Sequence, residues 1–81
     1  MTSNDEETTH NVQVTISSLG NERRTIRFDS MTDEKIKVLI EEVRLSFGTV
    51  RVSNALLLSG SDGVVVFANL DNVAFVEVHI V

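Results

Sequence analysis

Glu77 and His79 are the residues whose types and spacing come nearest to catalytic chemistry in this sequence. Residues two apart on a strand project from the same face, so this carboxylate and imidazole could form an acid–base pair. Catalysis by such a pair also needs a nucleophile, and no motif ties a Ser, Cys or Lys to this segment. An alternating polar strand face explains both residues without chemistry, and we expect a protein that is not an enzyme.

A cluster of arginines is the second feature that could do chemistry. Arg23, Arg24 and Arg27 form the only local group of basic residues, and Arg51 closes the basic middle of the chain. Guanidinium groups bind phosphates and carboxylates through paired hydrogen bonds, so these four are the candidate ligand-binding residues. The alternative is a solvated strand face that pairs with nearby acidic residues. The formal charge of −5 and the pI near 4.8 argue against nucleic acid as a partner, since phosphate neutralisation needs many clustered cations.

Metal and cofactor motifs are absent from the sequence. The two histidines, His10 and His79, lie near opposite ends of the chain, and there is no Cys. No HExxH or calcium-loop spacing occurs, so we expect no metal site. The glycine-containing segment 59–63 lacks the lysine of a phosphate-binding loop and is better explained as a hairpin turn. We therefore expect no cofactor.

The length of 81 residues allows one small domain. Its composition, 42% hydrophobic and 23% charged, is that of a folded globular chain. A domain of this size buries only about 60% of the surface that its unfolded chain exposes, so its stability is marginal unless a partner covers more of it. Oligomerisation is therefore a reasonable expectation.

The first residues differ in composition from the rest. Residues 1–11 are polar and acidic, which predicts a disordered tail, and residues 12–81 form the predicted domain. There is no apolar run of 18 residues and no signal-peptide pattern, so we expect a cytoplasmic protein with no membrane partner.

Hydrophobic periodicity predicts the elements that position these residues. Alternation at Val12, Val14 and Ile16 predicts a strand, and residues 18–21 predict the turn to a second strand. Thr32 is a predicted helix N-cap. The helix that follows has an apolar stripe and ends near Gly48. The stripe consists of Ile36, Leu39, Ile40, Val43 and Phe47.

Three further strands are expected after the helix, over residues 50–58, 64–67 and 73–81. The resulting order is ββαβββ. This order predicts an α+β fold, a mainly antiparallel sheet with one amphipathic helix packed on one face.

The strands after the helix are apolar at successive positions, at 56–58 and 64–67. This pattern indicates that both faces are buried, whereas one helix covers only one face. We expect a second copy of the chain to cover the other face. The alternative is a sheet that curls into a barrel-like shape and buries that face within itself. The predicted interface residues are Leu56, Leu58, Val64, Val66 and Phe75.

The order ββαβββ over residues 12–81 resembles the β-grasp, or ubiquitin-like, family. Conjugated members and sulfur carriers end in Gly-Gly, whereas His79, Ile80 and Val81 end this sequence, so the resemblance implies a fold without that covalent chemistry. Separately, the segment NLDNVAFVEV at 69–78 resembles the closing hairpin of small uncharacterised bacterial and phage-encoded proteins. That similarity implies a prokaryotic or viral origin.

These observations favour a non-enzymatic protein-interaction module, a homo-oligomer that acts by binding another protein. The alternative is a protein that sequesters a small molecule or nucleotide, with the anionic ligand held between subunits near the four arginines.

Overall fold

The computed structural model describes residues 8–48 and 54–81 and has the α+β fold predicted from the sequence. The predicted strand start at 50–53 and the candidate ligand residue Arg51 lie outside the described residues, as does most of the predicted tail. The element order is ββαβββ, as expected. The elements are β1 (Thr9–Ser18), β2 (Arg23–Thr32), α1 (Asp33–Ser46), β3 (Ala55–Ser59), β4 (Val65–Asn69), the short 3-10 helix η1 (Leu70–Asn72) and β5 (Val73–Ile80).

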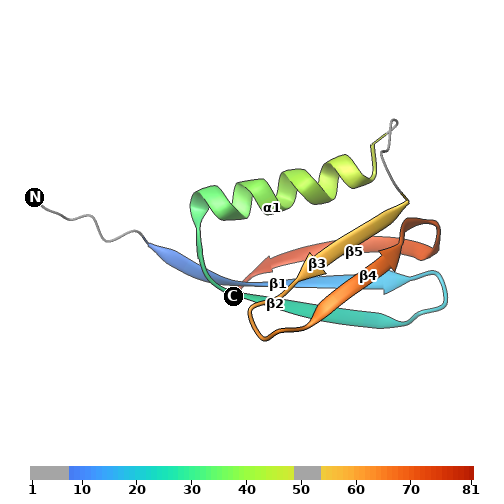
Figure 1. Ribbon diagram of the computed structural model, residues 1–81, viewed down its shortest axis with the longest axis horizontal. Coiled ribbons are helices and arrows are strands. Elements are labelled where there is room, and N and C mark those ends of the chain that lie inside the picture. Colours follow the sequence, from blue (N-terminus) through green and yellow to red (C-terminus); the bar gives the residue numbers. More distant parts are fainter. Residues whose placement is uncertain (1–7, 49–53) are drawn as a thin grey trace, which may run out of the picture.

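The strands divide into two antiparallel sheets. One has the order β2-β1-β5 and the other is the β3–β4 hairpin. Figure 1 shows α1 along one side of the three-stranded sheet and the hairpin crossing in front of it. The helix and the hairpin therefore cover the same face of β2-β1-β5. The opposite face is covered by no described element, and we call it the open face.

The core lies between that covered face, α1 and the hairpin. Alternation puts every second residue of β1 inward, and the same face continues onto β2. The helix contributes one stripe of its predicted apolar set, while Ile40 and Phe47 of that set are exposed at its margin. The buried apolar residues are Val12, Val14, Ile16, Ile26, Ile36, Leu39, Val43, Leu56, Leu58 and Leu70.

The start of α1 follows the predicted capping. Thr32 is the N-cap, and its hydroxyl accepts a hydrogen bond from the Lys35 backbone N–H at 3.2 Å. Near the other end, the Arg44 guanidinium donates hydrogen bonds to Glu41 and lowers the pKa of that carboxyl. Phe47 closes the helix, with its N–H donating to the Arg44 carbonyl. These local bonds fix the length of the helix that covers the core.

The strand β1 begins earlier than expected, because residues 9–11 pair with neighbouring strands. The Val81 N–H donates to the Asn11 carbonyl at 2.8 Å, and the Asn11 side chain accepts from the Ser30 N–H at 3.2 Å. Residues 9–11 therefore belong to β1. The prediction of a disordered tail over residues 1–11 is wrong for these residues.

The tip of the β3–β4 hairpin is fastened to the edge of β2. The Ser61 N–H donates to the Arg27 carbonyl and the Ser61 hydroxyl accepts from the Asp29 N–H, both at 2.8 Å. Gly60 allows the close approach, because a Cβ there would lie 2.6 Å from the Ile26 Cγ2 and 2.8 Å from the Arg27 carbonyl oxygen. The predicted turn at 59–63 thus also joins the two sheets.

Candidate functional site

The outward side of the β3–β4 hairpin carries a group of exposed apolar side chains. In the hairpin register Leu57 pairs with Phe67 and Ser59 pairs with Val65. The exposed fractions of the residues are 53% for Leu57, 50% for Val65 and 76% for Phe67. We call Leu57, Val65 and Phe67 the hairpin face. Because directly paired residues share one side of a sheet, these three form a continuous apolar surface.

The exposed apolar residues of the hairpin lie one position along each strand from the residues predicted to form the interface. Leu56 and Leu58 are each only 4% exposed, and they and Val66 belong to the chain's own core or pack against it. A partner therefore cannot cover Leu56 and Leu58, and their prediction as interface residues is wrong. Alternate residues of a strand point to opposite sides, but here the residues on both sides are apolar. The sequence therefore did not indicate which of them face inward.

The other two predicted interface residues lie elsewhere. Val64 precedes β4 in the turn, where its carbonyl accepts from the Gly60 N–H at 2.8 Å. Phe75 pairs with Ser17 across the β1–β5 ladder and so lies on the open face. Both are exposed, at 43% and 44%, but Phe75 does not belong to the hairpin face.

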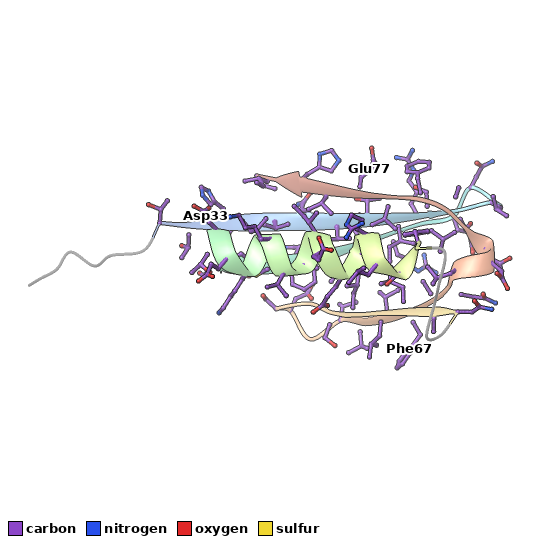
Figure 2. All side chains as sticks on the ribbon, turned by 90° about the horizontal axis from the view of Figure 1, so that it is seen from above. Asp33, Phe67 and Glu77 are labelled. Atoms are coloured by element: carbon purple, nitrogen blue, oxygen red, sulfur yellow. The ribbon has the colours of Figure 1, made fainter. Side chains whose placement is uncertain are left out.

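Apart from Phe75, the open face of β2-β1-β5 is mainly polar. One cross-strand row is Arg27–Gln13–His79, and the next is Thr25–Thr15–Glu77. The Thr15 and Thr25 hydroxyls are 3.3 Å apart and joined by a hydrogen bond. Figure 2 shows Glu77 and Phe67 on opposite sides of the molecule. The chain thus has two uncovered sheet faces of opposite character that point in different directions.

Glu77 and His79 lie on the same face of β5, as predicted, and this is the open face. The His79 Nε2 and Glu77 Oε2 atoms are 3.8 Å apart, which is ion-pair distance but longer than a hydrogen bond, and both side chains are well exposed. Thr15 is the hydroxyl residue directly across from Glu77, and it is bonded to Thr25. The arrangement therefore places a carboxylate and an imidazole side by side at the surface, and no activated nucleophile lies beside them among residues 8–48 and 54–81.

The structure separates the predicted arginine cluster. Arg23 and Arg27 pair with Ser17 and Gln13 and lie on the open face, whereas Arg24 pairs with Ile16 and lies on the other side of β2. Arg27 forms an ion pair with Asp29 at 3.4 Å. Alternation along β2 thus prevents the three from acting as one binding site.

Residues 8–48 and 54–81 contain no clustered metal ligands and no membrane-spanning helix. In this described part, no group of three or more His, Cys, Asp or Glu side chains is arranged to hold a metal ion. No helix among the same residues is long and apolar enough to cross a membrane.

Comparison of the chain with protein families, curated proteins and solved structures finds no match in any of the three. The predicted resemblance to β-grasp proteins therefore rests on the order of five strands and one helix. What the protein does has to be inferred from the geometry of its surfaces.

Proposed function

We propose that this chain is a non-enzymatic interaction module that works as a homo-oligomer, with the hairpin face as the surface through which copies associate. The observation that carries the proposal is the exposure of Leu57, Val65 and Phe67 on one side of one hairpin. Single exposed apolar residues are common on protein surfaces, whereas a contiguous group indicates an interaction site.

Phe67 is the expected centre of this interface. It is 76% exposed and lies directly across from Leu57. Burial of a Phe side chain contributes about 1.5–3 kcal/mol, and aromatic residues are enriched among the residues that dominate binding energy. Two copies related by a two-fold axis would bring this ring and its neighbours against the same group in the partner.

Charge favours this face over the rest of the surface for self-association. Each chain carries a formal charge of −5, so two copies repel each other through most of their surface. The hairpin face contains no charged residue, and the sequence after Arg51 has no Lys or Arg. A contact between two hairpin faces avoids the juxtaposition of like charges that other contacts would produce.

The hairpin also gains from being covered. In the described residues β3 and β4 pair only with each other. A two-stranded sheet is marginally stable by itself, so packing on its second face adds stability that the monomer lacks. The open face with Glu77 and His79 points away from Phe67 (Figure 2) and stays accessible for a second protein partner.

Sedimentation velocity of the full chain, from micromolar to millimolar concentration, tests the proposal. We expect the wild type to shift reversibly from monomer to oligomer as its concentration rises. The Phe67→Lys variant should weaken association by about ten- to a hundred-fold, because it removes the largest apolar side chain and places a charge in the contact.

Leu45→Lys is the matched control. Leu45 is 56% exposed in the last turn of α1, where a cation interacts favourably with the helix dipole. This variant should associate like the wild type. A wild type that stays monomeric throughout the concentration range, or a Phe67→Lys variant that associates as strongly as the wild type, would contradict the proposal.

A further inference from the structure

A cleft of about 290 Å³ lies at one end of the open face, where the β1–β2 turn meets the start of β5. It is lined by Ser17, Arg23, Ala74 and Phe75 together with residues of that turn. None of these belongs to the hairpin face. The cleft is therefore a separate feature, and any ligand it binds is independent of the proposed self-association.

Strand pairing explains why these side chains meet. Ser17 pairs with Arg23 on β2 and with Phe75 on β5, so all three lie on the open face in one cross-strand row. The next pair along is Ser18 with Val73, which leaves Ala74 as an extra residue in a β-bulge. Bulges bend a strand and redirect its side chains, and they are over-represented beside functional sites.

The Ser17 hydroxyl is the unusual group in this cleft. Ser17 is only 3% exposed, and its Oγ atom is buried without a hydrogen-bond partner. An unsatisfied buried polar group costs about 1–3 kcal/mol. The hydroxyl of the next residue is satisfied, since the Ser18 Oγ accepts from the Glu22 N–H at 3.0 Å. An unpaired hydroxyl in a cleft lining points to a missing partner.

The Arg23 guanidinium is also without a partner among residues 8–48 and 54–81. Each of the two nearby arginines has one: Arg27 pairs with Asp29, and Arg24 donates to the Arg23 carbonyl at 3.3 Å. Directly opposed residues in an antiparallel pair have Cβ atoms about 4.5–5.5 Å apart, so the Arg23 side chain starts beside the Ser17 hydroxyl. Two unused donors therefore border one cleft.

We infer that this cleft binds a small organic oxyanion, a phosphate or carboxylate attached to a planar apolar group. The Arg23 guanidinium donates to the anionic oxygens, the Ser17 hydroxyl donates a further hydrogen bond, and the planar group packs on the Phe75 ring. Phe75 is 44% exposed and available for that contact. The volume is at the lower limit of the roughly 300–1,000 Å³ typical of ligand pockets, which selects a compact ligand such as an aryl phosphate.

Titration of the ¹⁵N-labelled full chain with phenyl phosphate, followed by amide chemical shifts, tests the inference. We expect saturable shifts at Ser17, Arg23 and Phe75. Parallel titrations with benzoate and inorganic phosphate distinguish the two anionic groups and show what the ring adds. Benzyl alcohol, which is neutral, should produce no saturable shift at these residues.

Two adjacent arginines supply a matched pair of variants. Arg23→Gln should weaken phenyl phosphate binding about ten-fold or more, while Arg24→Gln, on the other side of β2, should leave it unchanged. Ser17→Ala should weaken it several-fold. The assignment is overturned if neither phenyl phosphate nor benzoate binds saturably, if the two arginine variants lose affinity equally, or if Ser17→Ala binds as tightly as the wild type.

Discussion

The hairpin face and the open face are both uncovered sides of antiparallel sheets, yet they have opposite chemistry. On the open face Gln13, Thr15 and Thr25 present polar groups to solvent, and Thr15 and Thr25 bond to each other. On the hairpin face Leu57 and Phe67 face solvent directly across from each other. A sheet with one solvated side should alternate between apolar and polar residues, and the open face obeys this rule except at Phe75, whereas the hairpin face does not.

The difference shows where the chain has apolar surface in excess. In β1 each inward residue has a polar neighbour that faces out, whereas β3 and β4 are apolar on both sides. The inward side of the hairpin is already used by the core through Leu56 and Leu58. The outward side has no such use within the described chain, which is why we assign it to association.

The largest expected effect comes from comparing an inward-facing residue of β3 with an outward-facing one. Leu58→Ala removes a side chain that is 4% exposed and should lower the free energy of unfolding by about 2–5 kcal/mol. Leu57→Ala, at 53% exposed, should change it by no more than about 0.5 kcal/mol in the monomer. Urea denaturation at low protein concentration measures both. Equal losses in the two variants would contradict the assignment of inward and outward sides.

The sequence predicted the fold because its local signals agree with one another. Thr32 capped the helix as expected, and alternation along β1 identified its inward residues. Which side of the hairpin faces the core could not be predicted in the same way. Leu57 has the same character as its two neighbours, so only the docking of the hairpin on the core decides which side faces out.

The candidate sites were predicted less completely, since they depend on pairing between distant strands. Proximity in sequence grouped Arg23 with Arg24, but alternation puts them on opposite sides of β2. Nothing in the sequence indicated that Ser17 lines a site. Its burial and missing partner arise from its place between Arg23 and Phe75, and that placement depends on the register of three strands.

A smaller effect is expected where the tip of the β3–β4 hairpin contacts β2. Gly60→Ala would place a Cβ 2.6 Å from the Ile26 Cγ2 and 2.8 Å from the Arg27 carbonyl oxygen, so the hairpin tip would have to move away from β2. We expect a loss of about 1–3 kcal/mol in the free energy of unfolding, measured by urea denaturation. Gly20→Ala is the control, because its nearest atom, the Ser18 Oγ, would lie 3.8 Å away. If both variants are equally stable, the tip is not packed on β2 as described.

The smallest effect concerns the one buried polar atom that lacks a partner on the open face of the described chain. Ser17→Ala removes the unpaired hydroxyl and should raise the free energy of unfolding by about 1 kcal/mol. For a domain of this size that is a rise in melting temperature of about 4–8 °C. Ser18→Ala should have the opposite sign, because the Ser18 Oγ accepts from the Glu22 N–H. Differential scanning calorimetry separates the two serines. A Ser17→Ala variant less stable than the wild type would mean that the hydroxyl is already satisfied within the chain, and the open face would then be polar surface without a site.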